Sequence, residues 1–398
     1  MSKSYGKTRI ACYVGYTVQA IINNFLPILF IVFQKQYKLN YEQLGRIVFI
    51  NFFIQIFADF LTPKIVKYIG YKGSAILCHG LAAFGLILVS ILPNIIPDFY
   101  ASLVIAVAFY AFGSGIIEVV ISPMIEMLPL GKKGANMAFL HSFYCWGQAF
   151  TVLGTTALIF LLGFESWTLV PLAWAIVPLA NMFFFMTVPV IEPESGEDKK
   201  TAKDMFKSRE FFCFVVFMVC AGASEIAMSS WASMFAQKGL NVSKTVGDLL
   251  GPCAFAIFMG SGRIIGGVLS GRISYRKMII FNNILCVGCY LGAALLKNPF
   301  LALIACAVCG FAVSISWPGT FSLAATRFPH GGTLMFSILA LCGDLGCSSG
   351  PWLLGTVADI TNLNTGFIVS CIFPIAMLIV AIFVLKEKDC KLSEDILK

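Results

Sequence analysis

Long apolar stretches without charged residues constrain this chain more than any other feature. The first runs from Ile10 to Gln34, 25 residues that include no Lys, Arg, Asp or Glu. A hydrocarbon core about 30 Å thick needs roughly 20 helical residues, so this stretch is long enough to cross a bilayer as a helix. It is too long for the apolar core of a signal peptide. We therefore expect it to be retained as the first membrane span.

Eleven further apolar segments follow the first. Apolar residues make up 59% of the sequence and charged residues only 12%, about half the charged fraction of a soluble domain. These values exclude an ordinary soluble protein and predict an all-α integral membrane fold with twelve transmembrane helices. Charged residues and turn signals place the spans at about 10–33, 43–64, 73–92, 99–127, 134–162, 167–190, 209–236, 246–270, 277–296, 299–325, 332–358 and 363–385.

The distribution of basic residues predicts the orientation of these spans. With the N-terminus in the cytoplasm, 21 of the 28 Lys and Arg residues fall in cytoplasmic segments and five fall in outer loops. Such an excess is typical of cytoplasmic loops. We therefore expect a multi-pass protein of the plasma (inner) membrane with both termini cytoplasmic. This asymmetry accounts for the net charge of +8. We therefore expect the lipid bilayer as a partner and no binding of nucleic acid.

A hydrophilic stretch in the middle of the chain predicts two domains. Residues 192–209, EPESGEDKKTAKDMFKSR, have the composition of a solvated linker. The expected domains are an N-terminal six-helix bundle at 1–190 and a C-terminal six-helix bundle at 209–398. A cytoplasmic linker at 191–208 joins them.

The two halves repeat one another. Gly113 precedes Ser122-Pro123 in span four, and Gly310 precedes Ser316-Trp317-Pro318 in span ten; both Pro sites are kink signals. A basic loop also follows the second span of each half. Two such six-span repeats resemble the major facilitator superfamily. In that fold the substrate site lies near mid-membrane between the halves, which rock about it.

The loop pattern of that family, Gly-x-Leu-x-Asp-Arg-x-Gly-Arg-Lys, is matched in part. After span eight, Gly267, Leu269 and Arg272 match, and Gly271 stands in place of the Asp. Near the end of span two, Asp59 matches the Asp of the pattern, but the Gly-x-Leu that precedes this Asp in the family is absent. The resemblance implies that Asp59 and Arg272 act in gating, with the carboxylate against a helix N-terminus that locks one conformation. A solvated loop acid is the alternative for Asp59.

A few of the ionisable residues inside predicted spans are selected as functional candidates, because their burial in a membrane is costly. They are Glu118 in span four, His141 in span five, Glu225 in span seven, Arg263 in span eight and Asp344 in span eleven. Desolvation disfavours the charged form of a carboxylate, so these acids and His141 are candidates for proton coupling and substrate contact. Arg263 is a candidate gating residue. A static ion pair of Arg263 with Asp344 or Glu225 is the alternative.

Motifs in four or five spans resemble a narrower branch. Span four reads GSGIIEVVISP from Gly113 to Pro123, span ten reads SISWPGTFSL from Ser314 to Leu323, span one carries Asn23-Asn24, and span eleven ends GPWLLGTVAD from Gly350 to Asp359. Together they are similar to the fucose permease branch, the fucose–galactose–glucose:proton symporters. The resemblance implies that Glu118 serves proton and sugar, that His141 contacts the sugar and that Trp317 offers it an aromatic face.

One position departs from that branch. The permease has an acid three residues after the Asn pair of span one, where this chain has Pro27. Asp344 or Glu225 could replace this missing acid. Further candidates for substrate contact are Asn23, Asn24, Trp146, Gln148 and Trp231. Asn and Gln also join helices by hydrogen bonds, however, and Trp residues near span ends anchor helices at the membrane interface.

Two other patterns fit helix packing better than cofactor chemistry. The CxxC pairs Cys286–Cys289 and Cys306–Cys309 lie within spans and have no His nearby. The GxGxxxG stretch at 260–266 lacks the strand context of a dinucleotide site. We expect no metal, no cofactor other than a proton gradient as energy source, no enzymatic activity, and a monomer.

These observations favour a secondary active transporter. The leading expectation is proton-coupled symport of a small polar solute, with a sugar implied by the resemblance. Efflux of a drug or metabolite by proton antiport is the alternative. A membrane sensor that does not transport is less favoured, because such proteins usually add a soluble signalling domain.

Overall fold

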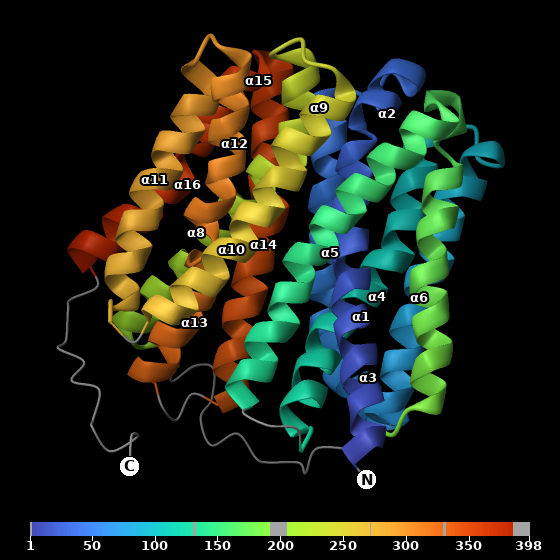
Figure 1. Ribbon diagram of the computed structural model, residues 1–398, viewed down its shortest axis with the longest axis vertical. Coiled ribbons are helices and arrows are strands. Elements are labelled where there is room, and N and C mark those ends of the chain that lie inside the picture. Colours follow the sequence, from blue (N-terminus) through green and yellow to red (C-terminus); the bar gives the residue numbers. More distant parts are fainter. Residues whose placement is uncertain (1, 130–132, 192–204, 271, 329–331, 385–398) are drawn as a thin grey trace.

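The computed structural model describes residues 2–129, 133–191, 205–270, 272–328 and 332–384, and the secondary structure in these ranges is helical throughout. The helices form two bundles side by side (Figure 1). The first comprises α1 (Ser2–Ile28), α2 (Phe30–Tyr37), α3 (Tyr41–Ile91), η1 (Leu92–Asn94), α4 (Phe99–Met127), α5 (Lys133–Leu162), η2 (Phe164–Ser166) and α6 (Leu169–Thr187). The second comprises α8 (Arg209–Lys238), α9 (Lys244–Asp248), η3 (Leu249–Cys253), α10 (Ala254–Leu269), α11 (Tyr275–Leu295), α12 (Pro299–Val313), α13 (Ser316–Arg327), α14 (Gly332–Ile360), α15 (Leu363–Ser370), α16 (Ile372–Ile379) and η4 (Val380–Val384).

Grouped in chain order, the described helices make twelve membrane crossings. Nine stretches are long and apolar enough to cross a membrane, and the bent pair α1–α2 makes a tenth. One of the nine, α3, supplies two crossings because its 51 residues are interrupted at Gly70. The 29-residue helix α14 completes the set. The predicted all-α fold with twelve transmembrane helices is therefore confirmed.

Gly70 makes the turn between the second and third spans. Its backbone angles, φ 71° and ψ 175°, lie outside the helical region and in a region that side chains other than hydrogen rarely tolerate. The loop predicted around Gly70 is therefore a tight turn, with helix on both sides.

Two breaks within spans are associated with proline. Pro27 has no N–H, and its ring crowds the carbonyl four residues earlier; α1 and α2 meet just after it at an angle of 42°. In span ten the helix is interrupted at Ser314-Ile315, shortly before Pro318, as the kink signal there predicts. In span four, by contrast, α4 continues through Pro123.

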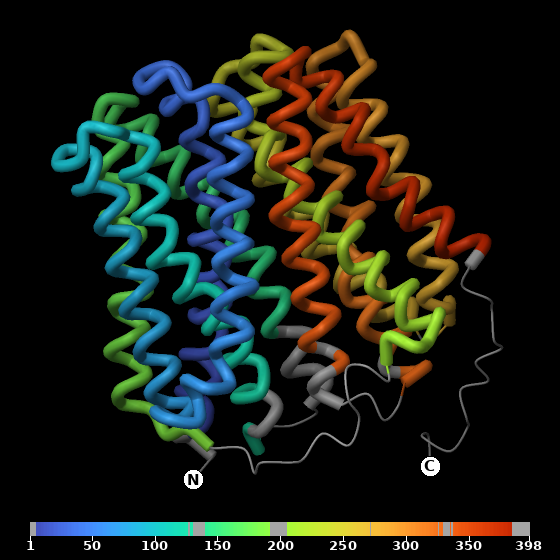
Figure 2. Tube along the Cα trace, turned by 180° about the vertical axis from the view of Figure 1, so that it is seen from behind, coloured from blue at the N-terminus to red at the C-terminus, as the bar shows by residue number. Residues whose placement is uncertain are grey.

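The predicted orientation gives names to the two ends of the molecule. We call the end at which α1 begins the inner face and the opposite end the outer face. The turn in the middle of α3 lies at the inner face, and α2 and α9 lie at the outer face (Figures 1 and 2). Most of the predicted linker at 191–208 falls outside the described residues, so the domain limits remain a prediction.

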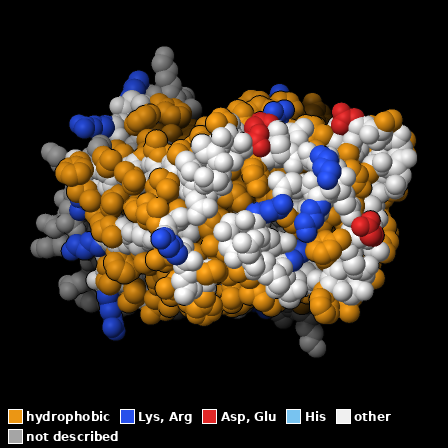
Figure 3. Space-filling model, turned by 90° about the horizontal axis from the view of Figure 1, so that it is seen from above, with side chains coloured by type: hydrophobic (Ala, Val, Ile, Leu, Met, Phe, Trp, Pro, Cys, Tyr) orange, Lys and Arg blue, Asp and Glu red, His pale blue; other side chains and the backbone are white. Residues whose placement is uncertain are grey.

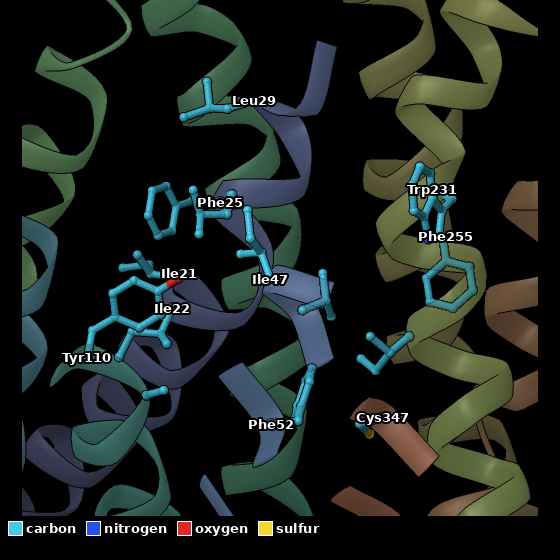
Figure 4. Close-up of a cluster of buried hydrophobic side chains, with 14 of the residues drawn as sticks. Ile21, Ile22, Phe25, Leu29, Ile47, Phe52, Tyr110, Trp231, Phe255 and Cys347 are labelled. Atoms are coloured by element: carbon cyan, nitrogen blue, oxygen red, sulfur yellow. The ribbon is translucent and has the colours of Figure 1, made fainter. Parts of the chain in front are cut away.

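The two bundles meet along α3 and α14, along α5 and α10, and along α1 and α8. Figure 4 shows the apolar part of this contact, with Phe25 and Phe52 on one side and Trp231 and Cys347 on the other. Close packing stabilises such contacts in lipid, where the hydrophobic effect between helices is weak. A Cβ atom added to Gly45 of α3 would lie 2.8 Å from the carbonyl oxygen of Pro351 in α14, so the contact requires a residue without a side chain there.

Candidate functional site

Polar side chains of α1, α3 and α4 form a hydrogen-bonded network inside the first bundle. Asn51 and Gln55 each donate to Asn23 Oδ1 over 3.0 Å, and Ser114 donates to Gln55 Oε1 over 2.9 Å. All four side chains are buried. Asn51 Oδ1 is buried as well but has no hydrogen-bond partner among the described residues. A cavity of about 10 Å³, lined by Asn23, Asn51 and Pro27 among others, has room for about one water molecule beside this network.

Glu118 lies one helical turn after Ser114 on α4. It accepts a hydrogen bond of 2.7 Å from Gln19 Nε2 of α1. The hydroxyl of Tyr16, also on α1, is hydrogen-bonded to Ser122 over 2.6 Å. Neither Gln19 nor Tyr16 was among the residues selected from the sequence. The signal was their spacing from Asn23, because residues three and four apart share one face of a helix.

Arg263 of α10 reaches from the second bundle to the first. Its Nη1 donates to the backbone oxygen of His141 in α5 over 3.4 Å, and its Nη2 lies 3.5 Å from Glu225 Oε2 of α8. Of the two ion pairs considered from the sequence, the structure thus forms the one with Glu225. Arg263 Nε is buried and has no partner in the part of the chain that the structure describes. The His141 ring packs edge-on against Tyr16, with ring centroids 5.2 Å apart.

Tyr144 connects these two groups of residues. It lies three residues after His141 on α5, and its hydroxyl is 3.5 Å from Asn24 Nδ2. Asn24 makes a second hydrogen bond, 2.9 Å long, to a carbonyl of its own helix at Ala20. Tyr144 was missed from the sequence, and its spacing from His141 is the signal that could have found it.

Asp59 and Asp344 lie on the two helices along which the bundles meet. Asp59 lies within α3 and Asp344 within α14, which pack against each other. Asp59 Oδ1 and Asp344 Oδ2 are buried and lack partners among the described residues. Asp59 therefore lies within a helix and not in a loop, and its gating role remains a prediction.

A buried ion pair at the outer face also joins the bundles. Lys244 Nζ lies 2.7 Å from Asp248 Oδ2 and donates to the backbone oxygen of Ile28 over 2.8 Å. Asp248 accepts further hydrogen bonds from Thr156 of α5, over 2.7 Å, and from Ser233 of α8. The Ile28 carbonyl is free to accept because α1 ends there at the bend. The sequence placed Lys244 in an outer loop and gave no sign of this contact.

Aromatic side chains pack beside the ion pair. Trp231 is fully buried and donates from Nε1 to the carbonyl of Pro351 over 3.0 Å. Its ring centroid lies 5.3 Å from that of Phe30 and 6.0 Å from that of Tyr41. The backbone N–H of Tyr41 in turn donates to Asp359 of α14 over 3.2 Å. Trp231 thus belongs to the contact between the bundles and not to the lipid interface.

A cavity of about 640 Å³ lies on the outer side between α2 and α5 of the first bundle and α8 and α9 of the second. Several Lys and Arg side chains gather on one part of the outer face (Figure 3). Thr156, Lys244, Gln237 and Lys238 line the cavity. Because Thr156 and Lys244 also belong to the ion-pair cluster, this cavity ends at the contact that joins the two bundles.

The remaining candidates are dispersed. Trp317 of α13 is half-buried and packs on α14, where a Cβ atom added to Gly343 would meet its ring. Gln148 is buried on α5. Trp146 is 45% exposed and so lies at the protein surface. Arg272 is exposed beyond the end of α10 at the inner face. The structure therefore gathers the ionisable candidates of the spans but leaves Trp146 and Arg272 apart from them.

The cysteine pairs and the glycine stretch behave as packing residues. Cys286 Sγ lies 3.8 Å from Cys309 Sγ of the neighbouring helix, and both are buried. Among the described residues, no group of three or more His, Cys, Asp or Glu side chains is arranged to hold a metal ion. A Cβ atom added to Gly262 would lie 2.7 Å from Ser314 Cβ, so close helix packing at the GxGxxxG stretch is confirmed.

Comparison with known proteins connects this arrangement to a family. The family model described as Major Facilitator Superfamily matches residues 12–351. A protein of Helicobacter pylori named "Putative glucose/galactose transporter" is 22% identical over 314 residues, which cover 74% of this chain and 75% of that protein. "Membrane protein MosC" of Rhizobium meliloti is 22% identical over 351 residues, 85% of this chain and 82% of that protein.

Solved structures share the fold at low sequence identity. One structure of the E. coli fucose:proton symporter FucP has a TM-score of 0.65 at 18% identity, covering 96% of this chain and 100% of that chain. A D-xylose-proton symporter has a TM-score of 0.78 at 15% identity, covering 96% and 98%. These likenesses establish the architecture of two six-helix bundles, and the family model covers most of the sequence. The chain therefore belongs to the major facilitator superfamily of membrane transporters.

Proposed function

We propose that this transporter carries a small polar solute, a sugar, by proton-coupled symport through alternating access. The observation that carries the proposal is the pair of unsatisfied polar atoms, Asn51 Oδ1 in the first bundle and Arg263 Nε in the second. A buried polar group without a partner costs about 1–3 kcal/mol. A hydroxyl-rich solute between the bundles would supply hydrogen bonds to both halves.

We assign two roles to Glu118, which are to bind the transported proton and to contact the solute. It lies on α4 of the first bundle one helical turn before Ser122, which is hydrogen-bonded to Tyr16. Tyr16 packs against His141, whose carbonyl accepts a hydrogen bond from Arg263 of the second bundle. A carboxyl group in a low-dielectric interior takes up and releases a proton as water gains or loses access. The side-chain amide of Gln19 can donate a hydrogen bond to the ionised carboxylate of Glu118 and can accept one from its protonated form.

Other side chains fit the recognition of a sugar. Asn23, Asn24 and Gln148 offer amide donors and acceptors, and His141 adds a ring nitrogen. Trp317 offers an aromatic face to the apolar C–H face of a sugar ring. The names of the relatives favour the same class, since they include a glucose/galactose transporter and symporters of fucose and xylose.

The remaining expectations complete this proposal. The protein sits in the plasma (inner) membrane with both termini cytoplasmic, acts as a monomer and uses a proton gradient without a cofactor. The excess of basic residues on the inner side supports the orientation.

The test is uptake of radiolabelled fucose, galactose, glucose and N-acetylglucosamine by proteoliposomes, with and without an inward proton gradient. The proposal expects accumulation of at least one sugar only with the gradient. Glu118→Gln should abolish accumulation, whereas Glu165→Gln, the same change at an exposed position of η2, should leave it intact. Full accumulation in Glu118→Gln would remove the role of Glu118. No uptake of any sugar by folded protein would favour efflux or another solute.

A further inference from the structure

The cavity on the outer side between the two bundles is lined by three basic residues. Lys35 of α2 belongs to the first bundle, and Lys238 of α8 and Lys244 of α9 belong to the second. Among the described residues that line the cavity there is no Asp or Glu. Its volume of about 640 Å³ is within the usual range for pockets that bind small molecules. The cavity therefore has the size of a ligand site and the charge of an anion site.

The position of these lysines is unusual for the outer side of a membrane protein. Basic residues gather in cytoplasmic segments, and in the predicted orientation only five of the 28 Lys and Arg residues fall in outer loops. Three of those five, Lys35, Lys238 and Lys244, line this one cavity. Solvated loop residues without a common role would be scattered over the outer surface, so this convergence indicates a shared ligand.

Two of the three positive charges have no carboxylate beside them. Lys244 is neutralised within the protein by Asp248, which lies 2.7 Å away. Within the described part of the chain neither Lys35 nor Lys238 forms an ion pair, and both are exposed. Lys35 Nζ lies 5.7 Å from the ring centroid of Phe164, a contact that orients the ammonium group without cancelling its charge. Each bundle thus contributes one uncompensated cation to the cavity.

The rest of the lining combines hydroxyl groups with an apolar rim. Ser243 and Thr245 are exposed on either side of Lys244 and can donate hydrogen bonds to an anion. On the opposite side, Phe160 near the end of α5 is 76% exposed and Phe164 is 40% exposed. Aromatic residues at the ends of membrane spans lie at the level of the lipid headgroups. The cavity is therefore continuous with the surface that contacts lipid.

We propose that this cavity binds the phosphate group of an anionic phospholipid of the outer leaflet between Lys35 and Lys238. A phosphate accepts charge-assisted hydrogen bonds from ammonium groups, and basic pockets between transmembrane helices bind lipid headgroups by the same chemistry. A water-soluble phosphate would contact the lysines equally well but would leave Phe160 and Phe164 uncovered. The apolar part of a lipid covers them, so the rim favours a lipid as the source of the phosphate.

Such a lipid would join the two bundles at the outer face, because its phosphate contacts one lysine from each of them. A ligand that binds only the closed arrangement raises the ratio of closed to open molecules by the factor 1 + [L]/Kd. Lipid present at about ten times its Kd would thus favour outer closure about tenfold. This role of the cavity goes beyond the proposed function, because it holds whichever solute is carried.

Binding is measured on the full chain in detergent by native mass spectrometry, with phosphatidylglycerol or zwitterionic phosphatidylcholine added in increasing amounts. One phosphatidylglycerol should bind more tightly than the rest, and phosphatidylcholine should not replace it. Lys35→Gln and Lys238→Gln should each weaken this binding by roughly fivefold, the usual contribution of one basic residue at an anionic lipid surface. Lys297→Gln, the same change at an exposed outer lysine that does not line the cavity, should leave it unchanged.

A distance measurement tests the effect on closure. Spin labels are attached to cysteines introduced by Ile95→Cys and Ile360→Cys, exposed positions at the outer ends of the two bundles. Cys342, which is not fully buried, and Cys390 are replaced by serine. In nanodiscs that contain equal amounts of phosphatidylglycerol and phosphatidylcholine, the short-distance population should exceed that in phosphatidylcholine alone. Lys35→Gln should remove most of this difference.

Several results would overturn the site. Equal weakening of phosphatidylglycerol binding by Lys297→Gln would show diffuse attraction instead of a cavity, as would equal affinity for phosphatidylcholine. Inorganic phosphate and glycerol phosphate are added in competition, and displacement of the lipid by either at micromolar concentration would assign the lysines to a soluble phosphate and overturn the lipid. Phosphatidylglycerol binding that leaves the distances unchanged would overturn the role in closure.

Discussion

Replacing Asp248 with Asn tests whether the buried ion pair holds the outer face closed. The carboxylate of Asp248 is fully buried and neutralises Lys244, whose side chain is 9% exposed. Breaking a buried pair by removing one partner costs about 3–5 kcal/mol. Lys244 keeps its hydrogen bond to Ile28, and its flexible stem can carry the ammonium toward the outer cavity that it lines. We therefore expect a cost near 2–3 kcal/mol, or roughly 30- to 150-fold in the ratio of outer-closed to outer-open molecules.

Spin labels on Glu165→Cys and Lys297→Cys, exposed positions in outer loops of the two bundles, report this ratio as a distance distribution. Asp248→Asn should enlarge the long-distance population, and far-UV circular dichroism should show that the helices remain. In the double variant Lys244→Met with Asp248→Asn, the long-distance population should fall part of the way back to its wild-type value, because removing both charges leaves no unpaired ion. An unchanged distribution in the single variant, or equal opening in the single and double variants, would refute the assignment of this pair as an outer closure.

Three further changes test other contacts. Gly45→Leu should open the outer side in the same distance measurement, because its side chain would collide with the carbonyl of Pro351; an unaltered distribution would contradict the packing of α3 on α14. Gly70→Ala should lower the thermal unfolding midpoint through about 1–3 kcal/mol of backbone strain at φ 71°, whereas Gly267→Ala, which meets open space, should not. Arg263→Met should destabilise the protein by about 3 kcal/mol because it leaves Glu225 buried without its cation, and adding Glu225→Gln should recover part of the loss; equal unfolding midpoints for the single and double variants would argue against the pair.

The sequence predicted the spans well because the membrane imposes a length and a composition that can be read locally. It also selected most ionisable residues of the interior, since each stands out against an apolar background, as Glu118 and Arg263 do. It could not predict which of them would meet. Arg263 and Glu225 lie on different helices, and their pairing depends on how α10 packs near α8. Gln19 and Tyr144 were missed for a different reason. A single polar residue in a span does not stand out as functional until a neighbouring residue shows which face of the helix carries the site.

The outer ion pair was beyond prediction for a third reason. Lys244 and Asp248 follow the usual spacing of an exposed helix pair, which contributes little to stability. What makes this pair different is burial beneath the ends of α1 and α5, and that burial follows from the bend after Pro27, which turns the Ile28 carbonyl toward α9. The same proline thus removes the acid that the resemblance led us to expect and creates the acceptor that the outer contact uses.

The two contacts between the bundles differ in what can break them. The contact between α3 and α14 depends on close packing, because a Cβ atom added to Gly45 would lie 2.8 Å from the carbonyl oxygen of Pro351. The Lys244–Asp248 pair joins opposite charges that are largely shielded from solvent, so the loss of either partner leaves a buried ion. Water that enters the cavity beside Thr156 and Lys244 would solvate these charges, which favours separation at the outer side. We therefore expect changes to the ion pair to alter how long the outer side stays closed, and changes at Gly45 to alter how closely α3 packs on α14.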